Sequence, residues 1–283
     1  MYTELQKRAD YTILQRLIVN LVQSRVGQPS NVGQAWLNDA QNLARKMFEH
    51  LVSLRVLTNA HCVEIDQSHS FEFIDHSSVK VVTRAAFETY LVFFFIFGGS
   101  DPSLSEFRHK IWRYGGLADR QKSQLDSSKA CDILAAEKVV MDHLKLEIEA
   151  SSHLSAYANT AAKKILKGEW RGGKSWADLS TDAGFHESYF RNIYGYLCGY
   201  SHASYISVLQ VGQAQSLDDQ QTLASVCIDI GLVLMANFVR AYCKLFEDTK
   251  QILDADLKAK AAVDRWGFGP DAWAKAIAKR SAS

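Results

Sequence analysis

The fold of this chain is decided by one stretch, residues 79–97, which reads VKVVTRAAFETYLVFFFIF. Its last seven residues are all apolar, whereas Arg84 and Glu88 lie in the part before them. A run of this length is far below the ~20 apolar residues that a membrane-spanning helix needs. The stretch therefore predicts a buried core helix, with Ser77 or Ser78 as its N-cap.

Helical patterns continue on both sides of this stretch. Alternation with a period of two is nearly absent, and only 3 prolines interrupt 283 residues, so long unbroken helices are expected. The sequence predicts an all-α protein, a multi-helix bundle of about 8–10 helices that begins with an N-terminal helical hairpin. Segment 60–77 predicts a polar loop with one short extended piece at 71–74, and residues 187–208 predict one long helix.

The predicted division of the chain has three parts. Residues 1–60 form the N-terminal helical hairpin, either as an appended unit or as part of the main domain, and residues 61–262 form the main helical domain. Residues 263–283 form a C-terminal tail. No linker composition marks these boundaries.

Charge and cysteine content exclude several classes of protein. The 32 Lys and Arg residues nearly balance the 31 Asp and Glu residues, so no global field attracts nucleic acid. The 5 cysteines are odd in number and form no C-x-x-C pair, which favours free thiols in a reducing cytosol. A second apolar stretch, 226–239, is interrupted by Asp229 and Asn237. Together with Arg240 and Lys244 these residues share one sector of a helical wheel, which predicts a polar stripe on a soluble helix. We expect a cytoplasmic protein with no membrane partner and no cofactor.

Arg84 and Glu88 are the first candidate site residues. Their i,i+4 spacing places them on one helical face, where they can pair. Burial of a charge is costly unless the charge is paired and hydrogen-bonded. An apolar helix that retains such a pair therefore carries either a structural pairing or a binding site, and both interpretations stay open.

The second candidate segment is residues 186–208, HESYFRNIYGYLCGYSHASYISV. Six of its side chains share a sector of about 100° on a helical wheel: Arg191, Tyr194, Cys198, Ser201, His202 and Tyr205. His202 is either a hydrogen-bonded core histidine or a general base or anion ligand. Arg191 lies ~16 Å from His202 along such a helix, so the two cannot contact one small group unless another segment bridges them.

These two segments carry a resemblance. RAAFETY (84–90) and SWADLSTDAGFHESYFRNIYGYLCGYSHAS (175–204) resemble a broad, uncharacterised family of bacterial all-helical proteins. That family has an early R-x-x-x-E helix and a late Y-x-x-L-[SC]-x-x-x-H-x-S helix. The matching residues are Arg84 and Glu88 in the first motif and Tyr194, Leu197, Cys198, His202 and Ser204 in the second. The resemblance implies a helical fold and no established activity.

A more distant similarity is to the HEPN superfamily of helical ribonucleases and nucleotide-binding proteins, whose nuclease motif is R-x4–6-H. Two pairs fit this spacing, Arg45 with His50 and Arg55 with His61. About one such match is expected by chance in a chain with this content of Arg and His.

Two further segments contain possible ligand-binding residues but match no established ligand motif. Segment 61–76 is rich in His, Cys, Asp and Glu but has no zinc-ligand spacing, so we expect a solvated loop and no metal site. GEWRGGKSW (168–176) does not fit the phosphate-binding loop motif, and it predicts a flexible surface loop. Its Lys174 and Arg171 are nevertheless able to contact a phosphate.

The leading hypothesis is a buried cluster of Arg84, Glu88, Tyr194 and His202 that binds a small anionic or nucleotide-like ligand. The candidate catalytic residues are His202, Arg84 and Glu88, and the candidate ligand-binding residues are Tyr194, Arg191 and Ser201. One alternative is a HEPN-like, metal-independent ribonuclease with RNA as its partner. Another is a non-catalytic helical scaffold or homo-oligomer.

Overall fold

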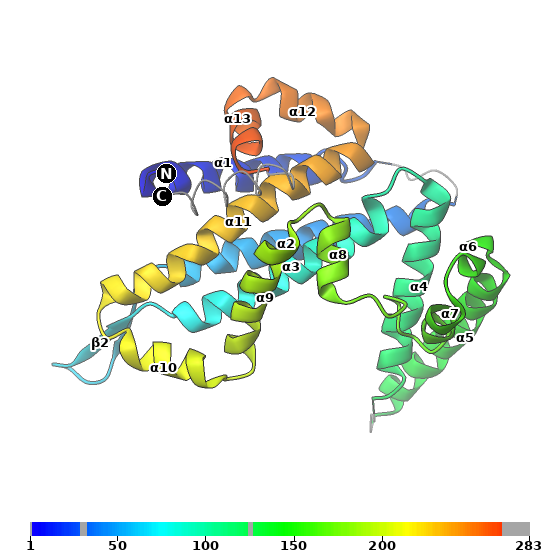
Figure 1. The fold of residues 1–283 in the computed structure, drawn as a ribbon, viewed down its shortest axis with the longest axis horizontal. Coiled ribbons are helices and arrows are strands. Elements are labelled where there is room, and N and C mark those ends of the chain that lie inside the picture. The colour runs from blue at the N-terminus through cyan, green and yellow to red at the C-terminus, as the bar shows by residue number, and fades with distance from the viewer. Residues whose placement is uncertain (1, 29–32, 124–126, 268–283) are drawn as a thin grey trace. The chain divides into compact units, whose positions relative to one another are not determined.

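The computed structural model describes residues 2–28, 33–123 and 127–267 (Figure 1). These residues form 13 α-helices, two short 3-10 turns and one pair of short strands. In chain order the α-helices are α1 (Glu4–Gln23), α2 (Asn38–Leu57), α3 (His76–Phe97), α4 (Pro102–Arg120), α5 (Ser128–Ala150), α6 (Ser152–Ser155), α7 (Asn159–Ile165), α8 (Trp176–Asp182), α9 (Glu187–Ser201), α10 (Tyr205–Gln213), α11 (Leu217–Leu245), α12 (Lys250–Ala255) and α13 (Leu257–Trp266). The predicted all-α class and N-terminal helical hairpin are confirmed.

The described helices outnumber the predicted 8–10 because local backbone breaks separate consecutive helices at three places. Ser151 is extended and its side chain caps α6, which separates that helix from α5. Ala203 has a left-handed backbone with φ 49°, which ends the predicted helix 187–208 and separates α9 from α10. Asp256 is extended and caps α13. Short polar caps of this kind are stable helix boundaries that hydrophobic periodicity alone does not reveal.

The chain divides into two compact units. Of the described residues, those within 1–93 and 180–283 form unit 1, and those within 94–179 form unit 2. The boundaries expected at residues 60 and 262 stay predictions. Of the expected tail, residues 263–266 belong to α13, whereas 268–283 lie outside the described residues.

The core of unit 1 is built around α11, which packs against α1 and α13. Leu14, Ile18 and Leu21 of α1 are fully or almost fully buried in this core. Asp10 of α1 accepts hydrogen bonds from the side chains of Arg265 and Trp266, and it thereby joins α1 to α13. Because Asp10 is itself buried, these bonds satisfy a charge that would otherwise be costly to bury.

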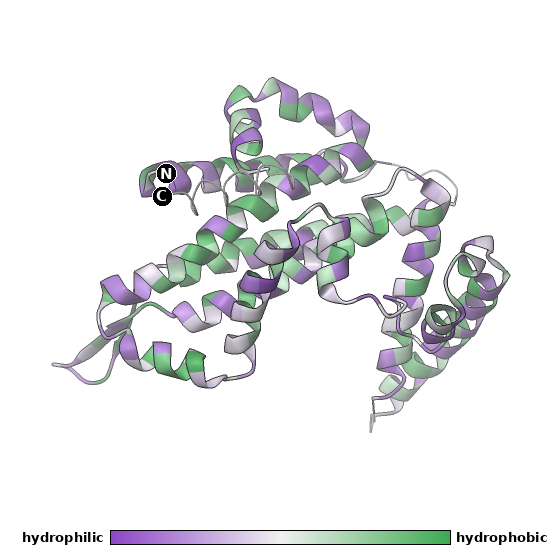
Figure 2. Ribbon diagram, viewed as in Figure 1, coloured by the Kyte–Doolittle hydropathy of each residue, from purple (hydrophilic) through white to green (hydrophobic). Residues whose placement is uncertain are grey.

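Helix α11 is long and apolar enough, by length and composition, to cross a membrane, and it is the one such helix within the described residues. The most apolar stretch of 18 residues in this helix has a mean hydropathy of 1.9. Figure 2 shows mainly hydrophobic residues along the helix. Of these 18 residues, 61% are buried inside the protein. The polar stripe predicted on this helix contacts neighbouring helices. Lys7 Nζ of α1 donates to Asp229 Oδ2 over 3.0 Å, and Arg240 donates to Asp264 of α13. The predicted lack of a membrane partner stays a prediction.

The segment predicted as a polar loop contains a small antiparallel hairpin. Strand β1 (His61–Glu64) pairs with β2 (Ser70–Phe73), and His61 lies opposite Phe73. The predicted extended piece at 71–74 therefore overlaps β2. Helix α3 follows, but it begins at His76, earlier than the predicted serine caps. The Asp75 carboxylate accepts from the backbone N–H of Ser78 and acts as the cap.

Unit 2 is built around α4 and α5, which pack along each other. Phe107 and Ile111 of α4 and Leu144 and Ile148 of α5 are buried. Asp101 caps α4 and Pro102 occupies its first turn, a position where the missing N–H of proline costs no hydrogen bond.

Candidate functional site

The Arg84–Glu88 pair forms on α3 as the spacing predicts. Arg84 Nε donates to Glu88 Oε1 over 2.9 Å, and the two side chains are 22% and 27% exposed. Ala86 and Phe87, which lie between them, are fully buried. The pair therefore lies at the edge of the core, and its charges are partly desolvated but also matched.

Tyr194 of α9 completes a bridge between the two helices. Its hydroxyl donates to Glu88 Oε1 over 2.6 Å, and it accepts a longer contact of 3.4 Å from Arg84 NH2. The Tyr194 ring stacks on Phe190, with centroids 4.8 Å apart, and Phe190 in turn packs edge-on against Phe87 of α3. An aromatic contact in the core thus positions the phenol against the ion pair.

The same contacts determine which groups are charged. Burial and the hydrogen bond to Glu88 raise the pKa of Tyr194, so its hydroxyl remains a donor. Partial burial disfavours the charged form of Arg84, but hydrogen bonds with Glu88 and Tyr194 outweigh this effect and raise its pKa. The guanidinium therefore stays cationic.

His202 reaches this cluster from the end of α9. Its Nε2 lies 3.5 Å from Arg84 NH1, and the residue is exposed. The prediction that His202 lies inside a buried helix is wrong, because it occupies the C-cap position and Ala203 leaves the helical backbone. The backbone N–H of Ser204 then bonds to Gly199 O over 2.8 Å, and this turn holds the imidazole beside Arg84.

The structure brings together four of the six predicted site residues. Arg84, Glu88, Tyr194 and His202 form the cluster, which we call the α3/α9 cluster. Arg191 instead pairs with Glu187 over 2.7 Å and its side chain is 67% exposed. The Ser201 hydroxyl points back to Leu197 O, at 3.4 Å. A shared helical sector predicted Arg191 and Ser201, but separation along the axis and local hydrogen bonding keep them out of the cluster.

A buried polar group beside the cluster was not predicted. Lys80 is fully buried, its Nζ lies 3.0 Å from His76 Nδ1, and it lies 4.0 Å from the ring centroid of Tyr200. Burial lowers the pKa of Lys80 to about 8, and burial together with the nearby Lys80 charge lowers the pKa of His76. The sequence contains a pattern that indicates this polar row. Four polar residues follow one another at intervals of four along α3, namely His76, Lys80, Arg84 and Glu88. This polar row faces tyrosines of α9.

The arginines of the two R-x4–6-H pairs are engaged elsewhere. Arg45 donates to Glu49, and Arg55 donates to Thr12 and Gln15. Within the described residues, no group of three or more His, Cys, Asp or Glu side chains is arranged to hold a metal ion.

The fold and the cluster define a mostly helical protein in which an ion pair on one helix is bridged by a tyrosine of another. The chain belongs to DUF5677, a family of unknown function, whose model matches residues 68–221 and thus more than half of the chain. The matched region contains α3, α9 and every residue of the α3/α9 cluster. No curated protein matches the chain, and no solved structure matches it.

The predicted resemblance to an uncharacterised family of helical proteins is confirmed, because the matching family has no known function and the structure is mostly helical. The comparisons give no support for a HEPN relationship.

Proposed function

We propose that the α3/α9 cluster binds a small anionic ligand, such as a phosphate or a nucleoside monophosphate. The observation that carries this proposal is the approach of Arg84 NH1 to the exposed His202 Nε2, at 3.5 Å. This distance is longer than an ordinary hydrogen bond, so Arg84 NH1 and His202 Nε2 do not saturate one another and can both bond to an incoming oxygen.

The rest of the cluster orients the cation for such a ligand. Glu88 accepts from Arg84 Nε, and Tyr194 contacts NH2, so two sides of the guanidinium are fixed and NH1 is left toward His202. A guanidinium held in this way loses little conformational freedom when it binds an anion, and its bonds to a charged oxygen are strong. Neutralisation by Glu88 limits the attraction, so we expect a ligand of modest affinity.

Binding of inorganic phosphate and AMP, measured by calorimetry and by thermal shift, tests this proposal. Arg84→Gln and His202→Ala should each weaken binding by about tenfold or more. Arg191→Gln is the matched control, because Arg191 lies on α9 outside the cluster and its loss should leave binding unchanged. Equal binding by the His202→Ala and wild-type proteins would contradict the proposal, and so would the absence of binding by the wild type. His202 is exposed, so its replacement should leave the fold intact.

The ribonuclease alternative rests on the same Arg84–His202 contact, since an adjacent cation and imidazole are suited to general acid–base chemistry on a phosphodiester. It predicts that RNA is cleaved without added metal and that His202→Ala abolishes cleavage. RNA that stays intact after prolonged incubation would count against it.

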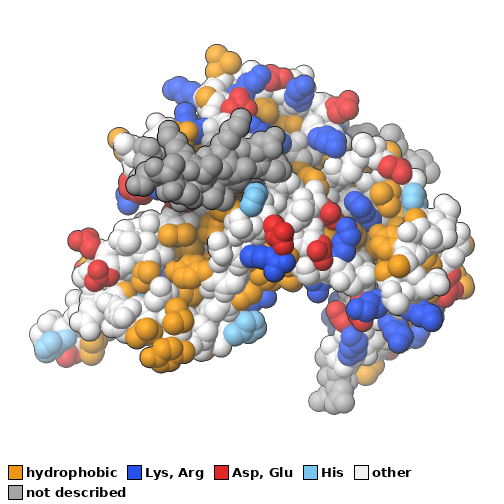
Figure 3. Space-filling view, viewed as in Figure 1, with side chains coloured by type: hydrophobic (Ala, Val, Ile, Leu, Met, Phe, Trp, Pro, Cys, Tyr) orange, Lys and Arg blue, Asp and Glu red, His pale blue; other side chains and the backbone are white. Residues whose placement is uncertain are grey.

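A scaffold or homo-oligomer is favoured by a different feature, the exposed apolar side chains of α10. Tyr205 is 77% exposed, and Ile206, Val208 and Val211 are also exposed. Figure 3 shows hydrophobic side chains on the surface in the region of α10. Apolar surface of this kind is typical of interaction sites. Sedimentation of the wild type and of a Tyr205→Ser/Val208→Ser variant would test self-association, which should be lost in the variant.

A further inference from the structure

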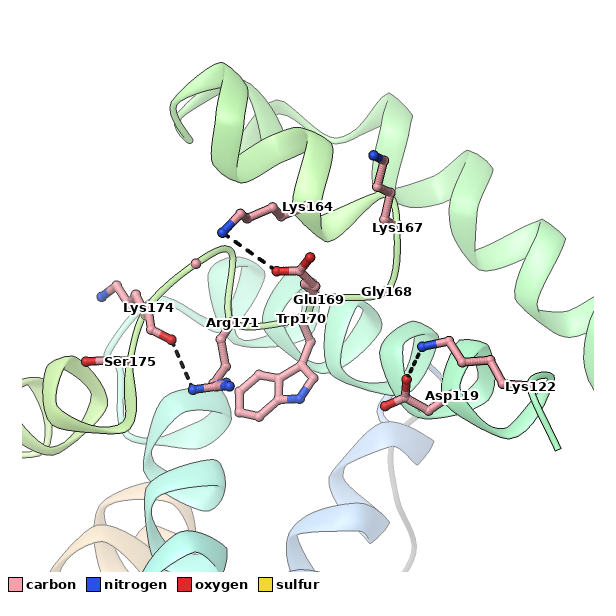
Figure 4. A pocket seen from close by; sticks show the side chains of 11 residues that line it. Asp119, Lys122, Lys164, Lys167, Gly168, Glu169, Trp170, Arg171, Lys174 and Ser175 are labelled. Atoms are coloured by element: carbon pink, nitrogen blue, oxygen red, sulfur yellow. Dashed lines mark hydrogen bonds and ion pairs between the residues drawn. The ribbon is translucent and has the colours of Figure 1, made fainter. Parts of the chain in front are cut away.

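Unit 2 contains a cavity of about 470 Å³ that is distinct from the α3/α9 cluster. It is lined by the C-terminal end of α4, by α7 and by the loop that precedes α8 (Figure 4). This loop contains the segment GEWRGGKSW, which the sequence predicts to be flexible. The volume of the cavity lies within the range of small-molecule binding sites, about 300–1,000 Å³.

The loop is held against α4 by close backbone packing. A Cβ atom on Gly115 of α4 would lie 2.6 Å from Gly168 O, so only glycine allows this approach. Gly168 itself has φ +92°, a backbone conformation that favours glycine. The Tyr114 hydroxyl donates to Leu166 O over 2.9 Å and fixes the chain just before the loop. The cavity wall is thus a defined structure.

Arg171 of this loop lines the cavity and is held by two contacts. Its guanidinium lies 4.9 Å from the ring centroid of Trp176 and donates to Lys174 O over 3.1 Å. Figure 4 shows Arg171 beside the Trp170 ring. Stacking on an aromatic face orients a guanidinium without neutralising it.

The cavity lining is strongly cationic. Five cationic residues line the cavity, against two carboxylates, Asp119 and Glu169. The cationic residues are Lys122, Lys164, Lys167, Arg171 and Lys174. Lys164 lies 3.8 Å from Glu169 and Lys122 lies 2.7 Å from Asp119. The carboxylates and lysines of both pairs are at least half exposed, and such surface ion pairs are weak, so a ligand of higher charge can displace them.

We infer that this cavity binds the oligophosphate chain of a small molecule, either inorganic triphosphate or a nucleoside triphosphate. The cations come from three separate places, namely the end of α4, α7 and the loop. Cations spread in this way suit a chain of several phosphates better than a single phosphate group. This site is independent of the proposed function, because it shares no residue with the α3/α9 cluster.

Calorimetric titration of the full chain with inorganic triphosphate and with ATP tests the inference. Lys164→Glu/Lys167→Glu should weaken binding of triphosphate by about tenfold or more. Lys163→Glu/Lys258→Glu is the control, because it makes the same change in net charge at exposed positions that do not line the cavity. Tighter binding of ATP than of triphosphate would identify a nucleotide ligand, and equal binding would identify the phosphate chain as the recognised group.

Three results would overturn the inference. They are no binding of either compound at low ionic strength, equal loss in the control and the test variant, and binding of single-stranded RNA without binding of triphosphate. The His202→Ala protein should bind triphosphate at this cavity as the wild type does, so failure of the α3/α9 proposal and failure of this one are distinguishable.

Discussion

The Tyr194 hydroxyl donates to Glu88 Oε1 over 2.6 Å and so joins two helices whose contacting residues are 106 positions apart in the chain. Through Glu88 it also restrains Arg84, which shares the same carboxylate oxygen. One tyrosine therefore connects the contact between α3 and α9 to the orientation of the candidate anion-binding guanidinium.

Loss of this hydroxyl should weaken both the fold and the cluster. We expect Tyr194→Phe to lower the free energy of unfolding by about 1–2 kcal/mol, since it leaves a partly buried carboxylate with one fewer donor. A double-mutant cycle with Glu88→Gln, measured by urea unfolding, should give a coupling of about 1 kcal/mol. Additive effects would show that the two groups do not interact.

The buried lysine predicts an unusual dependence of stability on pH. The pKa of Lys80 is lowered to about 8 from the ordinary 10.5, so between these values the unfolded chain binds more protons than the folded protein. The burial penalty is therefore fully present below pH 8, and stability from this group increases as the pH rises from about 8 toward 10.5.

Replacement of this lysine should remove that increase. Urea unfolding at pH 7.5 and 10 should show that the Lys80→Met protein gains less stability at high pH than the wild type. Lys46→Met is the control at an exposed position of α2, and it should follow the wild type. If Lys80→Met also follows the wild type, Lys80 is not held in a desolvated site.

The turn that presents His202 contains a strained residue. Ala203 has φ 49°, in the left-handed region where a Cβ atom costs about 1 kcal/mol and glycine does not. Ala203→Gly should therefore raise the free energy of unfolding by about 0.5–1 kcal/mol. The opposite sign is expected for Ala135→Gly, within the exposed part of α5, and thermal unfolding of both variants measures the difference.

Two adjacent glycines of α4 provide a matched pair for unit 2. Gly115→Ala places a Cβ atom 2.6 Å from Gly168 O, and it should destabilise the protein by about 1–3 kcal/mol. Gly116→Ala meets no atom within 4 Å, and it should stabilise the helix by about 0.5–1 kcal/mol. Similar effects of both substitutions on the thermal unfolding midpoint would contradict the described packing of the loop on α4.

The sequence predicted those parts of the cluster that depend on helical spacing. Arg84 and Glu88 are four residues apart on a continuous helix, so their pairing follows from local geometry alone. Helical periodicity predicts that His202 lies in a helix interior, because periodicity does not reveal that Ala203 adopts a left-handed backbone. Tertiary packing determines the remainder: the Lys80 ammonium is buried beside Tyr200 of a distant segment, and helical spacing within α3 does not reveal that contact.

The most direct measurement of the central claim is the NMR signal of the Arg84 guanidinium, assigned by comparison with Arg84→Gln, during titration with inorganic phosphate. The claim predicts a saturable change in the Arg84 Nε–H resonance that is weakened in His202→Ala, whereas the Arg191 resonance stays constant. An Arg84 resonance that does not respond, or that responds only as Arg191 does, would contradict anion binding at the α3/α9 cluster.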